Sequence, residues 1–507
     1  MNLNDIFEVE QLKYCYEQAY ALHRHTDIPD LFMREPDTVF TLPSAGDRTE
    51  GWELINRKFC GELYYVSPNE DSFHTGWQIC TPLLWEGDDG EIRGIFPTFG
   101  FLVLSMDAET MKPPYPVLST MELWQDRFAR REGLWKIHYL QAQFLLGQYA
   151  WSWNAPEDKG LAVQKKLRDI SHPLLNPGRN SFSDSLSRNC FSDSPDRTRD
   201  RDWADCGDGA DLYGIQFAQS LYSLLWQCCR MDEIPDLVFS DSDDVSVDYG
   251  EGEVCTGQEE VRRFFREMKD RAMRSGGLFR VDLPAGQWIQ IAPDGKSAEG
   301  HWTTMSRQIE QTEAGNRHRI GIGHLSSSFC KEDGIWKLKN IRWEKLQEFA
   351  PHGETPDQNL ENYRRNPEGW LTDLPLLTPL PREGAADRTE EILFLRNEVL
   401  SWFHRFNMGE TREEIFPCSS DKVRETLREL RRNSRYILAT SPVFQMDGRL
   451  SEAEGFFSVS LLAESGKDEM TYIRGSIGMT LVRAAEGWEI SRFSWYPYAS
   501  PGNWKMI

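Results

Sequence analysis

The chain has 507 residues and a formal net charge of −23 at pH 7. This length exceeds what one hydrophobic core usually accommodates and therefore indicates several domains. The acidic balance argues against a nucleic-acid partner, because phosphate binding requires clustered Lys and Arg side chains.

The sequence also argues against a membrane protein and a secreted one. No apolar run approaches the ~20 residues that span a bilayer. The first residues are acidic and show no charged-then-apolar leader. The ten cysteines form neither a paired framework nor a CxxC metal spacing. We therefore expect a cytoplasmic protein with no membrane association.

A sequence repeat organises the chain. Residues 133–137 read GLWKI, residues 334–338 read GIWKL and residues 487–490 read GWEI. The motif IPDLF at 28–32 recurs 206 residues later as IPDLVF at 234–239. Self-similarity of this kind predicts three domains of one fold in tandem.

Two stretches of different composition separate the repeats. Residues 151–208 are rich in Ser, Asp, Arg, Asn and Pro, and residues 351–388 are rich in Pro, Glu and Arg. Few large apolar side chains occur in the first stretch, which predicts a polar linker. We expect domains at 1–150, 209–350 and 389–507, with a second, Pro-rich linker at 351–388.

The order of predicted elements is the same in each repeat. A first helix shows apolar residues three and four apart, and in the first two repeats a short helix follows a glycine, Gly51 or Gly257. Strands rich in aromatic and β-branched residues come next, broken by Asp-Gly pairs at 89–90, 294–295 and 447–448. Helices followed by a meander of strands indicate an α+β fold.

Each repeat closes with a tryptophan: Trp135, Trp336 or Trp488. We interpret these three residues as structural, closing the sheet of each repeat against its helix.

This order of elements resembles the SnoaL-like branch of the nuclear-transport-factor-2-like superfamily, in three tandem copies. The AEGHW sequence at 298–302 is most similar to the pattern of the bile-acid 7α-dehydratase, and the arrangement is also similar to scytalone dehydratase. The resemblance implies three cone-shaped, cystatin-like α+β domains. In each, a curved antiparallel sheet is wrapped by helices around an apolar pocket.

The resemblance also implies a chemistry. Catalytic members remove a proton beside a carbonyl or expel a hydroxyl with Tyr, His and Asp, and they use no metal or organic cofactor. An apolar pocket suits this chemistry because it moves pKa values toward neutrality. The implied activity is that of a lyase (dehydratase) or isomerase acting on a hydrophobic cyclic molecule, such as a steroid, a bile-acid-like compound or a polyphenol.

Candidate catalytic residues come mainly from the first repeat. Tyr20 and His23 lie on the apolar face of the first helix, Asp27 follows it, and His74 precedes the next strand. The resemblance places His74 near the catalytic histidine of the dehydratases. Together the four residues predict a general acid–base set.

The other two repeats depart from this set. The second repeat has Trp226 at the position of Tyr20, and the third has His404 there. We expect the third repeat to be a scaffold. The candidates for a second pocket are Tyr222, Asp232, His301 and His324.

Other interpretations stay open at this point. A Tyr or His on an apolar helix face is more often a core residue with one satisfied hydrogen bond. The chain could be a non-catalytic ligand-binding or assembly protein, or a subunit of a larger oxygenase. Since single cones of this superfamily pair sheet against sheet, we also expect a homo-oligomer.

Overall fold

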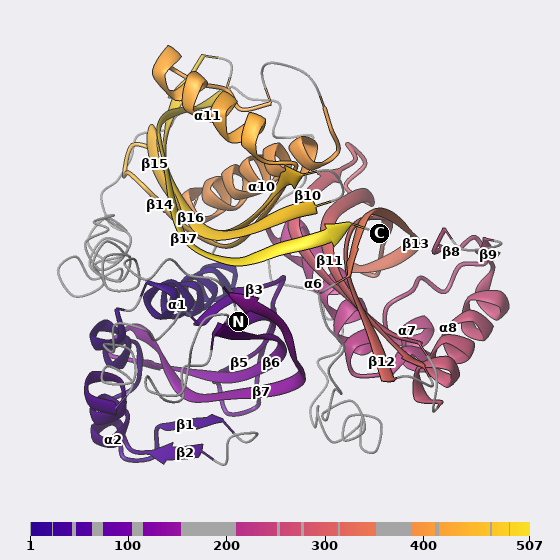
Figure 1. The fold of residues 1–507 in the computed structure, drawn as a ribbon, viewed down its shortest axis with the longest axis horizontal. Coiled ribbons are helices and arrows are strands. Elements are labelled where there is room, and N and C mark those ends of the chain that lie inside the picture. The colour runs from indigo at the N-terminus through magenta and orange to yellow at the C-terminus, as the bar shows by residue number, and fades with distance from the viewer. Residues whose placement is uncertain are drawn as a thin grey trace.

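The protein consists of three α+β units in tandem, and the units lie around a common centre (Figure 1). The prediction of three cone-shaped α+β domains is confirmed. The computed structural model describes residues 2–22, 24–42, 47–62, 75–103, 115–153, 209–250, 254–274, 278–312, 315–350, 387–410, 415–466, 469–485 and 487–506. We call the described parts of 2–153, 209–350 and 387–506 unit 1, unit 2 and unit 3.

Unit 1 begins with a long helix that lies against a strongly bent sheet. Its elements are α1 (Leu3–Ala21), η1 (His25–Leu31), β1 (Val39–Leu42), β2 (Asp47–Glu50), α2 (Trp52–Arg57), η3 (Lys58–Glu62), β3 (Thr75–Ile79), β4 (Leu83–Glu86), β5 (Ile92–Val103), β6 (Tyr115–Arg131) and β7 (Leu134–Trp153). The sheet is seven-stranded in the order β2-β1-β7-β6-β5-β3, and β4 also pairs with β5.

Unit 2 repeats this plan. Its elements are α6 (Gly209–Gln227), η6 (Met231–Glu233), α7 (Ile234–Leu237), β8 (Ser246–Asp248), β9 (Cys255–Thr256), α8 (Gln258–Met273), β10 (Leu278–Ile291), β11 (Ser297–Thr312), β12 (Gly315–Glu332) and β13 (Ile335–Ala350). In both units the last long strand pairs in parallel with a short strand. This short strand is β1, before α2, in unit 1 and β8, before α8, in unit 2.

Unit 3 is shorter at its start. Its elements are α10 (Asp387–Asn407), α11 (Asp421–Asn433), β14 (Tyr436–Met446), β15 (Glu452–Gly466), β16 (Glu469–Ala484) and β17 (Gly487–Met506). The ends of β13 and β17 pair through Phe349 with Met506 and Ala350 with Lys505, so the sheets of units 2 and 3 form one ten-stranded sheet.

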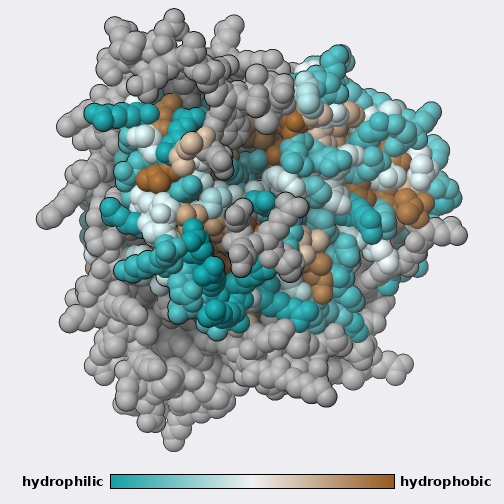
Figure 2. Space-filling view, turned by 90° about the horizontal axis from the view of Figure 1, so that it is seen from above, coloured by the Kyte–Doolittle hydropathy of each residue, from teal (hydrophilic) through white to brown (hydrophobic). Residues whose placement is uncertain are grey.

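Most residues of the two predicted linkers lie outside the described residues. The exceptions are residues 151–153, which end β7, and residues 387–388, which begin α10. No helix in the described part of the chain is long and apolar enough to cross a membrane. On the face shown in Figure 2, hydrophobic residues are interspersed among hydrophilic ones.

The glycines expected to open short helices do precede helices in units 1 and 2, but only α2 is short, since α8 has 16 residues. Gly51 precedes α2 with φ 91°, and Gly257 precedes α8 with φ 87°. Residues with a side chain rarely adopt this left-handed backbone, so glycine is required at both turns.

The closing tryptophans confirm their structural interpretation. In every unit the indole N–H donates to a carboxylate on the first helix, and a cation from the preceding strand pairs with the same carboxylate. The groups are Trp135, Asp5 and Arg130 in unit 1, Trp336, Asp211 and Lys331 in unit 2, and Trp488, Glu391 and Arg483 in unit 3. The three carboxylates and the three tryptophans therefore mark equivalent positions.

The units contact one another in a cycle. In each interface a polar side chain of one unit's first helix hydrogen-bonds backbone groups of a strand in the next unit. Gln11 of unit 1 bonds Pro442 and Phe444 of unit 3, Asn397 of unit 3 bonds Ile289 of unit 2, and Tyr213 of unit 2 bonds Leu84 of unit 1. The molecule therefore has an approximate threefold arrangement within one chain.

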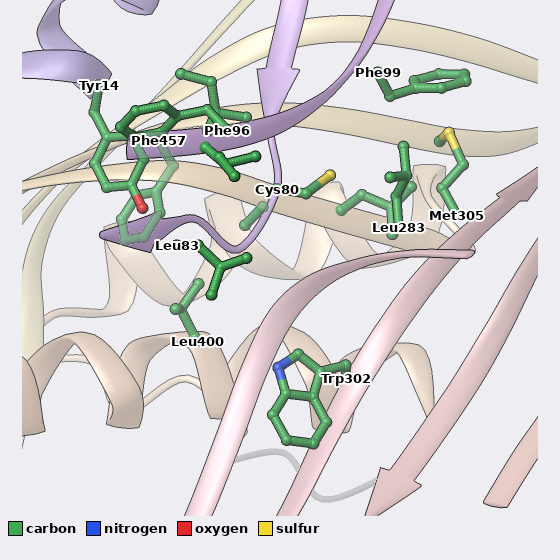
Figure 3. Packing of buried hydrophobic residues seen from close by; sticks show 14 of the residues in the cluster. Tyr14, Cys80, Leu83, Phe96, Phe99, Leu283, Trp302, Met305, Leu400 and Phe457 are labelled. Carbon is green, nitrogen blue, oxygen red and sulfur yellow. The ribbon is translucent and has the colours of Figure 1, made fainter. Parts of the chain in front are cut away.

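The three first helices meet at the centre. Glu10 of α1, Gln216 of α6 and Arg396 of α10 each lie five residues after the carboxylate that bonds the closing tryptophan, so their positions are equivalent. Arg396 pairs with Glu10 at 2.5 Å, and the Gln216 side chain donates to Glu10 at 3.1 Å. Around this centre one hydrophobic core spans all three units, as Tyr14, Leu283 and Phe457 illustrate (Figure 3).

Candidate functional site

The structure places Tyr20 at the end of α1, inside unit 1. Its ring centroid lies 4.5 Å from that of Trp77 and 4.9 Å from that of His25. Trp77 and His25 are buried, while Tyr20 is partly exposed. Tyr20 therefore lies at the edge of an aromatic interior, with part of its side chain at the surface.

Of the other three candidates of unit 1, the structure describes only Asp27, which lies outside this interior. Asp27 pairs with Arg24 at 2.6 Å, and its side chain is 31% exposed. His23 and His74 lie outside the described residues. Their role therefore stays a prediction.

A buried ion pair lies deeper in unit 1, below Tyr20. Lys13 of α1 places its Nζ 2.6 Å from Oδ2 of Asp126 on β6, and neither side chain is exposed. The same nitrogen lies 4.0 Å from the ring centroid of Trp124, which covers it. In an apolar, aromatic setting, burying each charge costs more free energy, and the two charges attract each other more strongly than in water.

Burial shifts both members of the pair toward their neutral forms. Desolvation raises the pKa of Asp126 to about 6, although the neighbouring Lys13 ammonium acts in the opposite direction. Desolvation likewise lowers the pKa of Lys13. A carboxylate with a pKa near 6 is well suited to accept a proton at neutral pH.

Two further polar groups face the same interior. The Tyr16 hydroxyl is buried and has no hydrogen-bond partner among the described residues, and its ring packs 5.6 Å from that of Trp124. The Glu122 carboxylate accepts hydrogen bonds from the indoles of Trp77 at 2.6 Å and Trp124 at 2.9 Å. Because buried hydroxyls are nearly always paired, Tyr16 is a candidate to bond a ligand.

The three units fill the equivalent positions differently. In each unit the helix position lies eight residues after the carboxylate that bonds the closing tryptophan, and the strand position lies nine residues before that tryptophan. The pairs are Lys13 with Asp126 in unit 1, Gln219 with Ser327 in unit 2, and Val399 with Met479 in unit 3. The unit 2 pair is hydrogen-bonded at 2.8 Å.

The interior of unit 2 is polar, and several of its polar side chains bond one another. The Tyr222 hydroxyl is hydrogen-bonded to that of Tyr249. Arg280 pairs with Asp282 at 3.0 Å and lies over the Trp343 ring, 3.5 Å from its centroid. Tyr222 is therefore buried in the interior of unit 2, and its hydroxyl already has a protein partner.

The remaining second-pocket candidates lie elsewhere. Asp232 pairs with Lys269 of α8 at 2.7 Å near the surface. Thr304 of β11 faces the interior of unit 2, where it accepts a hydrogen bond from the Trp343 indole. Since successive strand residues point to opposite faces, His301 projects from the other face of the sheet. The structure therefore separates His301 and His324 from Tyr222.

The two histidines meet a third one from unit 3. His301 and His324 lie 3.3 Å apart between Nδ1 and Nε2, and the ring of His404 on α10 lies 5.0 Å from that of His324. Burial lowers the pKa of His324 to about 4 and that of His404 to about 3, and it also lowers the pKa of His301. Burial therefore favours the neutral form of all three imidazoles.

The structure corrects one alignment of the repeats. The sequence comparison puts His404 at the position of Tyr20, but the tryptophan-bonded carboxylates pair Tyr20 with Phe406. His404 is instead equivalent to Gln18. The tyrosine that units 1 and 2 share is thus Tyr16 and Tyr222.

A small cavity lies at the centre of the molecule, where the three units meet. Its volume is about 30 Å³, and Tyr14, Gln216, Arg396 and Pro442 are among the lining residues. This volume has room for about one water molecule. The centre is therefore too small for an organic substrate.

Comparison with known proteins found a family similar in sequence to unit 2. Residues 210–342 match the sequence profile of the SnoaL-like domain family. A comparison with curated proteins found no match.

Three solved structures of similar fold each cover less than a third of this chain. A protein provisionally named scytalone dehydratase from Novosphingobium aromaticivorans has 17% identity and a TM-score of 0.23, with 29% of this chain and 92% of that one covered. An NTF2-like protein with a cystatin-like fold from the same organism has 13% identity and a TM-score of 0.22, with 27% and 82% covered. A hexachlorocyclohexane dehydrochlorinase from Novosphingobium barchaimii has 12% identity and a TM-score of 0.23, with 28% and 92% covered.

Proposed function

We propose that unit 1 is a cofactor-independent acid–base site that acts as a lyase (dehydratase) or isomerase. The observation that carries this proposal is the buried pair of Lys13 and Asp126 beside the Tyr16 hydroxyl, which has no hydrogen-bond partner among the described residues. These are three polar groups of different acidity in one aromatic interior. Such an arrangement supplies a base, a hydrogen-bond donor and a fixed positive charge.

The proposed roles follow from the chemistry of each group. Asp126 removes a proton from a carbon atom of the substrate, and the Lys13 ammonium stabilises the negative charge that develops. The Tyr16 hydroxyl hydrogen-bonds the substrate oxygen. In a dehydration, Tyr16 gives its proton to the departing hydroxyl, water leaves, and the proton on Asp126 restores the tyrosine. Tyr20, at the edge of this aromatic interior, would contact the substrate as it enters, whereas the acid–base roles of His23 and His74 stay predictions from the sequence.

The comparison of the three units indicates that the ion pair of Lys13 and Asp126 serves a function and is not there to stabilise the fold. The same fold accommodates a hydrogen-bonded pair at these positions in unit 2 and the apolar pair Val399 and Met479 in unit 3. A buried ion pair usually stabilises a protein no better than an apolar pair of similar volume. The charges in unit 1 are therefore not needed for folding.

The aromatic interior favours a hydrophobic cyclic substrate. The rings contact one another in the order Tyr16, Tyr20, Trp77, Trp124 and back to Tyr16, with neighbouring centroids 4.5 to 6.3 Å apart. The two contacts of Trp124 are edge to face and the other two are tilted. Aromatic walls bury large apolar rings effectively and leave orientation to the few polar groups. A steroid, a bile-acid-like molecule or a polyphenol fits this description.

A swap between units tests the proposal. The double variant Lys13→Gln and Asp126→Ser installs the hydrogen-bonded pair of unit 2, so the fold should be retained. Turnover of hydroxylated and oxo-steroids and polyphenols should fall by ~10²-fold or more. Ser327→Ala in unit 2 is the matched control and should leave turnover unchanged. Full turnover in the double variant would rule out the assigned roles.

A second candidate is a non-catalytic ligand-binding or assembly protein. The observation that favours it lies in the interior of unit 2, where Tyr222, Arg280 and Asp282 already have protein partners. This alternative predicts that compounds are retained on purification and released unchanged. Mass spectrometry of the retained compounds before and after incubation distinguishes the two functions.

A further inference from the structure

Three histidines from three separate elements meet between units 2 and 3. His301 of β11, His324 of β12 and His404 of α10 each place a ring nitrogen within 4.8 Å of the other two. We propose that this histidine cluster binds one divalent transition-metal ion of the zinc class, with a coordination position left open. The site would join the helix of unit 3 to the sheet of unit 2.

The spacing of the rings fits the proposal. A tetrahedral zinc ion with Zn–N bonds of about 2.0–2.1 Å holds its nitrogen ligands about 3.4 Å apart. Nδ1 of His301 and Nε2 of His324 are 3.3 Å apart. The ring centroid of His404 lies 5.7 Å from that of His301. Two ligands are thus at metal-binding distance, and the third has a ring nitrogen within 4.8 Å of both.

The ligand set selects the class of ion. Imidazole nitrogens suit Zn²⁺, Co²⁺, Ni²⁺ and Cu²⁺, whereas Mg²⁺ and Ca²⁺ require oxygen ligands. Three protein ligands leave the fourth tetrahedral position for water or another small molecule. His301 and His324 are partly exposed, which gives an ion and a fourth ligand access to the cluster.

Neighbouring side chains hold the rings in place. The Thr303 hydroxyl lies 3.4 Å from Nδ1 of His404 and accepts a hydrogen bond of 3.0 Å from the amide of Asn407. Trp288 stacks on His301 with centroids 5.1 Å apart. Outer contacts of this kind orient histidine ligands in metal sites.

The other two interfaces show that the fold does not require these histidines. The helix carboxylates, the glycines at 94, 300 and 455, and the strand register define the equivalent positions. The equivalents of His301, His324 and His404 are Phe456, Ser476 and Gln18 between units 3 and 1, and Ile95, Leu123 and Leu224 between units 1 and 2. Three histidines have therefore gathered at one interface only.

Metal titration of the full chain after chelator treatment tests the proposal. Calorimetry with Zn²⁺ should show an ion bound at the cluster. Bound Co²⁺ should give visible absorption typical of nitrogen and oxygen ligands, without the intense sulfur charge-transfer band that cysteine binding would produce. His404→Gln and His324→Ser, which install residues of the equivalent interface, should each weaken binding by at least ~10²-fold, beyond the effect of a lost outer contact.

The controls separate this site from other metal-binding residues. His138→Gln alters a histidine on β7 that pairs with Glu91, and it should bind metal as the unaltered protein does. Circular dichroism should show all variants folded, and His324→Ser serves if His404→Gln does not fold. The proposal is overturned if the unaltered chain binds neither ion or if both cluster variants bind as it does. Because the readout is metal binding, it does not depend on turnover in unit 1.

Discussion

Lys13 and Asp126 form a fully buried ion pair at positions where unit 3 has only apolar side chains. Removing one partner of such a pair leaves an uncompensated buried charge, whereas replacing both with apolar groups is often neutral or stabilising. The energetic role of the pair can therefore be separated from its chemical role by substitutions taken from the same chain.

Lys13→Val alone should lower the free energy of unfolding by roughly 3–5 kcal/mol, because Asp126 loses its counter-charge. Lys13→Val with Asp126→Met, the pair of unit 3, should recover most of this loss. Urea denaturation followed by near-ultraviolet circular dichroism measures both. A double variant as unstable as the single one would contradict the conclusion that the charges are not needed for folding.

The sequence shows only part of this site. Tyr20 is identified by its place at the end of an apolar helix face, and the structure puts it at an aromatic interior. Lys13 and Asp126 are far apart in the chain, and each looks like an ordinary charged residue. Lys13 shares one helix with the buried residues Leu3, Val9 and Tyr16, and this setting could have indicated a buried charge. Its partner on β6 could not be predicted, because that contact depends on how the sheet folds against the helix.

At the scale of elements, α1 packs against the sheet of unit 3 through a second buried carboxylate. Glu17 lies 3.2 Å from Arg474 of β16 and accepts hydrogen bonds from the Ser458 hydroxyl of β15. Desolvation by burial raises the pKa of Glu17 to about 7, although Arg474 and Ser458 act to lower it. This interface is therefore sensitive to pH.

Glu17 should make the protein less stable as pH rises. Its carboxyl has a pKa near 4.5 in the unfolded chain and about 7 in the folded one, so the folded state binds the proton more tightly. This contribution to stability is present below pH 4.5 and is lost as pH rises toward 7. Relative to Glu17→Gln, the unaltered protein should lose about 3 kcal/mol between these pH values. Parallel pH profiles for the two proteins would contradict the assigned shift.

The elements themselves were largely predictable, whereas their contacts were not. Repeated motifs such as IPDLF, the Asp-Gly turns and the closing tryptophans give the order of helices and strands in each unit. The sequence alone aligns α10, the first helix of unit 3, two residues out of register with α1, because no shared motif fixes its position. Gln11 and Asn397 show no sequence signal for their equivalent contacts with a neighbouring strand.

For the molecule as a whole, the central residues are equivalent in position but different in charge. Glu10, Gln216 and Arg396 bring an acid, an amide and a base to the centre. Three identical chains would place three like residues there, so this set is complementary only when the three units differ. The order of units in one chain ensures this. A homo-oligomer through sheet packing stays a prediction.

Removing the central charges should show strong coupling. Glu10→Gln and Arg396→Gln should each destabilise the protein by roughly 3–5 kcal/mol, since each leaves a buried charge unpaired. The double variant, which places Gln at all three positions, should lose clearly less than the sum. A double-mutant cycle of unfolding free energies measures this coupling, and additive losses would show that Glu10 and Arg396 act independently.

The most direct test of the acid–base site is an incubation in D₂O of chelator-treated protein with the panel of steroids and polyphenols. Mass spectrometry and NMR then follow the products. The proposed mechanism predicts that a compound loses water or shifts a double bond without added metal or cofactor, or exchanges the hydrogen on its reacting carbon for deuterium, and that Lys13→Gln with Asp126→Ser abolishes both. Compounds that bind tightly but undergo neither conversion nor exchange would contradict the mechanism and favour the binding protein.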